Sequence, residues 1–275
     1  MKKLFLSFLL ITLSLPAWAG DSKESAFDRV MRTGTLKCGV FPWPPYFEID
    51  ANTQKIVGKA KPFYDAAASL LDIKIEYVDV NFATYIEDLK LGRIDAFCND
   101  GPYTTSFAKQ LNYVTPWFYA PVFLYGRKNE KIIKDTESFN RPDFRFTGID
   151  GDLSIDLKNK LLPKATLVAA SGMSDYSLLL MDIVGHKADA MILDVPSYDK
   201  FNKNNPEKIT LLYKKPLAVY PVGFSVLKSE QQLWQTLNTA TEMAINMGVA
   251  DKVLHDIDPT GKALYPTSKK YEAKE

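Results

Sequence analysis

Cysteine and histidine are scarce in this chain of 275 residues, which contains two of each. Two cysteines are too few for a miniprotein framed by disulfides or for a cysteine-based zinc site. The histidines, His186 and His255, lie far apart in the sequence and give little material for a histidine-rich metal site. We therefore expect neither a metal nor a cofactor, and we assign no role to His186.

The chain also lacks an excess of charge of either sign, because 34 Lys and Arg balance 33 Asp and Glu. A nucleic-acid-binding protein is expected to carry a basic footprint, so we expect no nucleic-acid partner. Glycine and proline, at 14 and 16 residues, are too few for a collagen-like or low-complexity chain. The 46% of hydrophobic and 24% of charged residues are ordinary for a soluble globular protein.

The N-terminus has the three parts of a secretory signal peptide. A basic start, Met1-Lys2-Lys3, precedes an apolar run at 4–15, and Ala17-Trp18-Ala19 has the small residues of a cleavage site. The alternative is an N-terminal membrane anchor, but the run is shorter than the ~18–20 residues of a spanning helix. We expect cleavage after Ala19 and a periplasmic mature chain of residues 20–275.

Strand-like and helix-like segments alternate twice along the mature chain. In the first part, strands are predicted at 36–40, 74–80 and 94–98, and helices at 62–71 and 84–91. In the second part, strands are predicted at 144–149, 165–170 and 188–193, and helices at 154–162 and 175–185. This alternation indicates an α/β protein with parallel sheets covered by helices.

The second α/β unit lies within the chain of the first. Two β-rich stretches at 121–128 and 220–228 flank it and are expected to cross between lobes, and a helical tail at 231–254 is expected to return to the first lobe. We therefore predict a first lobe from residues 20–125, a second lobe from 126–222, and a return to the first lobe at 223–275. Small ligands bind in clefts between such domains, at the carboxyl ends of parallel strands.

Several short motifs occur in an order that resembles the family 3 periplasmic solute-binding proteins, which serve polar amino acid uptake transporters. They are the first strand and aromatic loop LKCGVFPWPPYF at 36–47, GRIDA at 92–96, AKQ at 108–110 with YVTP at 113–116, and KADA at 187–190 with Leu193-Asp194. The resemblance covers nearly the whole mature chain. It implies a two-lobed type II periplasmic-binding-protein fold, and a monomer that closes like a hinged trap on a small-molecule ligand and delivers it to the permease of an ABC transporter.

The resemblance also implies a ligand site, which this chain keeps in part. Trp43 and Tyr46 stand where the family has an aromatic wall, and Asp194 stands where an aspartate takes the α-ammonium group of an amino acid. However, Phe107 stands at the position where the family has an arginine that binds the α-carboxylate. Asp152 replaces a hydroxyl residue that binds the same group.

Aspartates at these positions favour a ligand that donates hydrogen bonds, because buried carboxylates repel an anion and are costly when unpaired. We therefore expect a ligand without a free α-carboxylate: an amine, an amino-acid derivative or a hydroxyl-rich solute. The candidate ligand-binding residues are Trp43, Tyr46, Asp100, Tyr103, Thr104, Tyr119, Asp152 and Asp194.

Each of these assignments has a structural alternative. Asp194, Asp152 and Thr104 could be helix caps, since aspartate and threonine are common at that position. Trp43 could pack on the lobe surface, and Phe107 is expected to pack rather than to face a ligand. The residues Trp117, Phe118 and Tyr119 are expected to be hinge and core residues, of which Tyr119 is the one expected to reach the cleft.

The two cysteines leave a further question open. In the family topology, the strands that carry Cys38 and Cys98 are neighbours. An oxidising compartment permits a disulfide, but adjacent parallel strands rarely give good disulfide geometry. The alternative is a pair of buried thiols that act as small hydrophobic groups.

The altered site leaves a second function open besides uptake. The chain could be an accessory or partner protein of a periplasmic enzyme or receptor, with a degraded or absent small-molecule site. Catalysis is not expected. Dehydratases related to this family would need the arginine that Phe107 replaces, and lytic transglycosylases would need a further catalytic domain.

Overall fold

The structure is a computed structural model that describes residues 24–100, 105–128, 135–170 and 176–267. The predicted signal peptide at 1–19 and two candidate ligand residues, Tyr103 and Thr104, lie outside the described residues.

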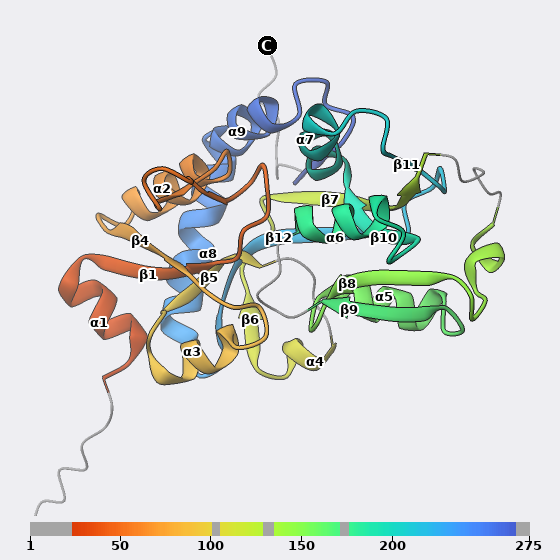
Figure 1. The fold of residues 1–275 in the computed structure, drawn as a ribbon. Helices are drawn as coiled ribbons and strands as arrows, with labels where there is room; N and C mark the ends of the chain where they lie inside the picture. The colour runs from red at the N-terminus through yellow and green to blue at the C-terminus, as the bar shows by residue number, and fades with distance from the viewer. Residues whose placement is uncertain (1–23, 101–104, 129–134, 171–175, 268–275) are drawn as a thin grey trace, which may run out of the picture.

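Two groups of strands and helices lie side by side and form two lobes (Figure 1). Lobe one contains α1 (Ala26–Thr33), β1 (Thr35–Val40), β2 (Glu48–Ile49), β3 (Ile56–Val57), α2 (Lys61–Ser69), β4 (Lys74–Asp79), α3 (Tyr85–Leu91), β5 (Ala96–Asp100), α4 (Thr105–Ala108), β6 (Leu111–Tyr113), α8 (Gln231–Asn246) and α9 (Val249–Ile257). Lobe two contains the 3₁₀ turn η1 (Thr136–Phe139), β8 (Arg145–Ile149), α5 (Leu153–Leu161), β9 (Thr166–Ala170), α6 (Tyr176–Val184), β10 (Ala190–Asp194), α7 (Val195–Asn204) and β11 (Ile209–Leu211). The long strands β7 (Phe118–Arg127) and β12 (Ala218–Leu227) connect them, and β13 (Tyr265–Pro266) pairs with β7.

The two lobes repeat one strand order. In lobe one, β1 pairs in parallel with β4 and β5, and β12 adds an antiparallel neighbour to β5. In lobe two, β8 pairs in parallel with β9 and β10, and β7 adds an antiparallel neighbour to β10. This arrangement confirms the predicted α/β class and its alternating strands and helices.

Strand β12 changes partners along its length. Residues 218–222 pair with β7, whereas residues 223–227 pair with β5 and β6. The predicted lobe boundaries at 125/126 and 222/223 fall within β7 and β12, respectively. By its pairing, β12 links β5 and β6 to β7.

The tail at 231–254 is helical, as predicted. It forms two helices, α8 and α9, which are separated at Gly248. Gly248 has a φ of 78°, in the left-handed region that glycine adopts without the steric cost of a side chain.

The aspartate of each D-A motif holds its lobe's parallel strands together. The Asp95 carboxylate accepts a hydrogen bond from the Lys37 N–H (2.9 Å), and the Asp95 N–H donates to the Lys37 carbonyl (2.7 Å). Asp189 and Arg145 make the same pair of contacts in lobe two, both at 2.7 Å. These two aspartates therefore have a structural role.

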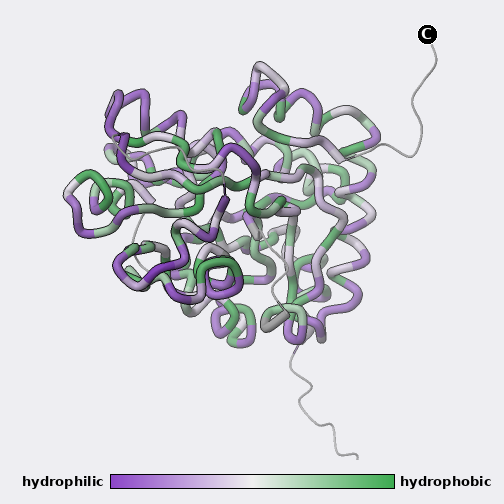
Figure 2. Tube along the Cα trace, turned by 90° about the vertical axis from the view of Figure 1, so that its right-hand side faces the viewer, coloured by the Kyte–Doolittle hydropathy of each residue, from purple (hydrophilic) through white to green (hydrophobic). Residues whose placement is uncertain are grey.

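The core is continuous from lobe one into lobe two. Buried residues of β1, β5, α2 and α8 pack in one cluster with buried residues of β7, β10 and β12. Figure 2 shows hydrophobic and hydrophilic residues following one another within the helical turns, as expected for helices with one face on a core. Cys38 and Cys98 are fully buried in lobe one and form a disulfide, with Cα atoms 5.7 Å apart. The structure thus answers the question that the sequence left open.

Candidate ligand-binding site between the lobes

Asp194 lies at the centre of the contact between the lobes. It ends β10 and is the N-cap of α7, where its carboxylate accepts hydrogen bonds from the Ser197 N–H (3.0 Å) and hydroxyl (2.8 Å). The same carboxylate accepts hydrogen bonds from the Trp43 indole N–H (2.9 Å) and the Tyr46 hydroxyl (3.1 Å) of lobe one. Asp194 is only 1% exposed, and its burial raises the pKa of the carboxyl group.

We call Trp43, Tyr46 and Asp194 the interlobe triad. The loop after β1 positions the two aromatic residues of the triad. The backbone N–H of Trp43 donates to the Phe47 carbonyl (2.8 Å), and the ring centroids of Trp43 and Tyr46 lie 4.4 Å apart. Tyr46 also stacks on Phe118 of β7, with ring centroids 5.5 Å apart. Four protein donors therefore satisfy the Asp194 carboxylate, two from each lobe.

Asp152 lies at the corresponding end of β8. It is the N-cap of α5, where its carboxylate accepts a hydrogen bond from the Ser154 N–H (3.0 Å), and it accepts a second from the Tyr176 hydroxyl (2.7 Å). Its exposed fraction is 8%. The helix-cap interpretation thus describes its contacts, and the carboxylate also faces the space between the lobes.

A small cavity, which we call the chamber, lies between the lobes beside the triad. Its volume is about 40 Å³. The described residues that line it are Phe41, Trp43, Phe82, Phe97, Asn99, Asp152, Tyr176 and Tyr220. Asn99 fixes the loop that forms one wall, because its amide accepts a hydrogen bond from the Phe41 N–H (3.1 Å) and donates one to the Phe41 carbonyl (2.7 Å).

Two acidic side chains act on the tyrosine hydroxyls that line the chamber. Burial, followed by the charge of Asp152, raises the pKa of the Tyr176 and Tyr220 hydroxyls well above the ordinary range. Asp194 contributes to the same shift at both tyrosines. A cation in this space would therefore be stabilised, and a carboxylate would be repelled.

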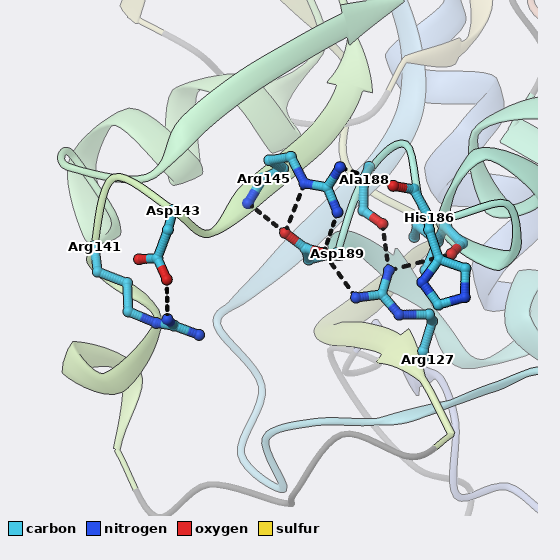
Figure 3. Close-up of polar contacts among 8 residues, drawn as sticks. Arg127, Arg141, Asp143, Arg145, His186, Ala188 and Asp189 are labelled. Carbon is cyan, nitrogen blue, oxygen red and sulfur yellow. Dashed lines mark hydrogen bonds and ion pairs between the residues drawn. The ribbon is translucent and has the colours of Figure 1, made fainter.

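No arginine lines the chamber, and all six arginines of the chain lie within the described ranges. Each is paired with an acidic group elsewhere: Arg29 with Asp95, Arg32 with Glu24, Arg93 with Asp88, Arg127 and Arg145 with Asp189, and Arg141 with Asp143. Figure 3 shows Arg127 and Arg145 on either side of Asp189. Arginine therefore supplies no carboxylate clamp in this cleft.

A larger cavity of about 720 Å³ lies outside the chamber and shares Phe41 with it. Residues of β4, of the loop after β1 and of helices α6 and α7 line it, so it also lies between the lobes. Lys200 of α7 donates to the Glu48 carboxylate of β2 across this cavity (3.0 Å). The lobes are thus joined by an ion pair as well as by the triad.

The structure separates the remaining candidate residues. Asp100 ends β5, where its backbone lies opposite Gly223 of β12. Tyr119 lies on β7 opposite Pro221 and Tyr265, and it is not among the described residues that line the chamber. Of the eight candidates, Trp43 and Asp152 line the chamber, and Tyr46 and Asp194 complete the triad beside it.

Several lining residues were not predicted from the sequence. Tyr176 belongs to the segment predicted as a helix at 175–185, and Tyr220 belongs to the crossing segment predicted at 220–228. Neither tyrosine is part of a recognised sequence motif. Asn99 offered one signal, because a polar residue near the carboxyl end of a predicted parallel strand lies where ligands bind. Phe107 packs against Phe82 and Tyr85, with ring centroids 6.5 and 5.9 Å away.

The described residues contain neither a metal-binding cluster nor a membrane-spanning helix. No group of three or more His, Cys, Asp or Glu side chains there is placed to hold a metal ion. None of the helices described has the length and apolar character needed to cross a membrane.

The fold and this interlobe site are those of a two-lobed binding protein. Residues 36–255 match the sequence model of the bacterial extracellular solute-binding proteins, family 3, and the chain belongs to this family. A curated relative, the probable histidine-binding protein of Campylobacter jejuni, is 22% identical over 260 residues, which cover 92% of this chain and 98% of the relative.

Solved structures show the same fold. An ancestral amino acid-binding protein, described as a precursor of cyclohexadienyl dehydratase, has a TM-score of 0.73 at 24% identity, covering 85% of this chain and 99% of its own. An arginine-bound substrate-binding protein of an amino acid ABC transporter from Streptococcus pneumoniae has a TM-score of 0.71 at 18% identity. The match covers 84% of this chain and 97% of that protein. The predicted type II two-lobed fold and family are thereby confirmed.

Proposed function

We propose that this protein is a periplasmic solute-binding protein, monomeric after removal of residues 1–19, that captures a small polar ligand for an ABC uptake transporter. Residues 20–125 and 223–275 would form one lobe and residues 126–222 the other. The ligand lacks a free α-carboxylate. The family and the names of its relatives support a solute-binding role, and the ligand class rests on the cleft.

The observation that carries the proposal is a pair of buried carboxylates in a cleft without an arginine. Asp152 and Asp194 are 8% and 1% exposed, and both raise the pKa of the tyrosine hydroxyls between them. A carboxylate ligand would add a third negative charge beside these buried side chains, where Coulomb interactions are stronger than in bulk water. An amine or a hydroxyl donor would instead reduce the repulsion.

The experiment is a binding screen of the mature chain by thermal shift and titration calorimetry, with amines, polyols and amino acids as ligands. We expect stabilisation by amines or polyols and none by glutamate. Strong binding of glutamate would refute the ligand class. Mass spectrometry of material that copurifies in the cleft provides an independent identification, and uptake of that compound with and without the partner permease tests transport.

We propose binding without catalysis. Dehydratases that resemble this family need a carboxylate-gripping arginine, and Phe107 holds that position within an aromatic cluster with Phe82 and Tyr85. Incubation with a carboxylated cyclohexadiene substrate should therefore give no product.

One feature favours the second function, an accessory protein of a periplasmic enzyme or receptor. The chamber of about 40 Å³ is far below the roughly 300–1,000 Å³ of most ligand pockets, and Asp194 is already satisfied by protein donors. If this function holds, calorimetry will detect no small ligand, and a periplasmic partner protein will be recovered with the chain instead.

A further inference from the structure

The chamber restricts both the size and the charge of what it can hold. We propose that its ligand is a small nitrogen-centred monocation, an ammonium or alkylammonium ion of about one to three heavy atoms. The size follows from the chamber volume of about 40 Å³, since a cavity measured in this way needs roughly 10–15 Å³ to hold one water-sized group. This inference rests on the proposed solute-binding function and narrows its ligand.

Tyr220 offers an acceptor to which no described residue donates a hydrogen bond. Its side chain lines the chamber and is 8% exposed, and its hydroxyl has no hydrogen-bond partner among the residues that the structure describes. A tyrosine hydroxyl can accept a hydrogen bond, so a donor in the chamber can pair with it there. An ammonium N–H can donate to this oxygen.

The remaining wall is largely aromatic. Six of the eight described residues in the lining carry aromatic rings, among them Phe41, which makes edge-to-face contacts with Phe82 (5.8 Å) and Tyr176 (6.0 Å). Aromatic rings attract alkylammonium ions through cation–π interactions. They offer few partners for a solute with many hydroxyl groups, whose donors would be left unpaired. The wall therefore favours a cation with at most a few N–H donors over a polyol.

Both lobes contribute to the wall. Phe41, Phe82 and Asn99 belong to lobe one, whereas Asp152 and Tyr176 belong to lobe two. A cation in the chamber contacts both lobes only when they are closed. Binding would thus shift the open–closed equilibrium towards the closed state, because a ligand favours the state for which it has the higher affinity.

The test is titration calorimetry of the mature chain with methylammonium chloride, after purification without ammonium salts. Sodium chloride at equal ionic strength controls for salt, and methanol controls for charge at similar size. Tyr220→Phe removes one hydroxyl and should weaken methylammonium binding by about three- to tenfold. Tyr265→Phe is the matched control, because Tyr265 is 48% exposed and outside the chamber, and it should leave the affinity unchanged.

Saturable binding of methylammonium, with none of methanol or arginine, is the expected result. Equal binding of methanol would overturn the charge selection, and an unchanged affinity in Tyr220→Phe would overturn the location. Binding of arginine or histidine but not methylammonium would overturn this inference and leave the solute-binding function standing. Failure of every solute to bind would overturn both and favour the accessory function.

Discussion

The interlobe triad can be tested by removing one hydroxyl group. In Tyr46→Phe the ring is kept, and with it the stacking on Phe118, while the 3.1 Å hydrogen bond to Asp194 is lost. Tyr46 is 1% exposed, so water cannot easily replace the missing donor. The carboxylate then keeps three of its four donors.

The magnitude follows from the charge of the acceptor. A hydrogen bond to a charged group contributes about 1.5–3 kcal/mol, more than one between neutral groups. Because every 1.4 kcal/mol corresponds to a factor of ten, the equilibrium between closed and open lobes should shift roughly ten- to a hundredfold towards the open state. The free energy of unfolding should fall by the same amount if the lobes unfold together.

Two measurements separate opening from unfolding. Small-angle X-ray scattering reports the radius of gyration, which should rise in Tyr46→Phe, and urea titration reports the stability. Tyr77→Phe is a matched control, because its hydroxyl also donates to an aspartate, Asp65, at 2.9 Å, but within lobe one. That variant should lose stability without opening. If Tyr46→Phe changes neither the radius nor the stability, Asp194 does not join the lobes in solution.

Three further predictions follow. The two arginines beside Asp189 help to lower the pKa of its carboxyl group to about 2. The stability that the charged carboxylate contributes is therefore present above pH ~3.9 and is lost as the pH falls towards about 2. In urea titrations, Asp189→Asn should lower the free energy of unfolding by about 2 kcal/mol at about pH 7, and this cost should vanish near about pH 2. Loss of the disulfide in a Cys38→Ala/Cys98→Ala double variant should lower the free energy of unfolding by about 2–4 kcal/mol, because the bond closes a loop with a sequence separation of 60 residues. Lys200→Ala breaks a partly exposed ion pair and should cost less than about 1 kcal/mol, and a larger loss would show that this pair contributes more to closure than its exposure suggests.

The strand and helix order could be predicted from the sequence because hydrophobic periodicity is local. For example, the predicted strand at 36–40 and helix at 84–91 agree with β1 and α3 to within one residue. The tail was less predictable. The apolar periodicity of 231–254 continues across Gly248, and only the backbone conformation of that glycine separates α8 from α9.

The site was predictable only in part, because its contacts join distant parts of the chain. Asp194 was expected either to take a ligand or to cap a helix, and it does cap α7. Its contacts with Trp43 and Tyr46 span 151 and 148 residues, so no local pattern indicates them. The same holds for Tyr220, which reaches the chamber because β12 crosses between the lobes.

The triad and the chamber place different demands on a ligand. An ammonium group that reached Asp194 would have to displace the Trp43 or Tyr46 donor, and it would lose about 1.5–3 kcal/mol of the interaction that joins the lobes. Such a ligand would compete with closure. A cation beside the Tyr220 hydroxyl displaces no donor of the described part of the chain and is still attracted by the charges of Asp152 and Asp194. Binding there adds to closure, which is the coupling that a two-lobed solute-binding protein requires.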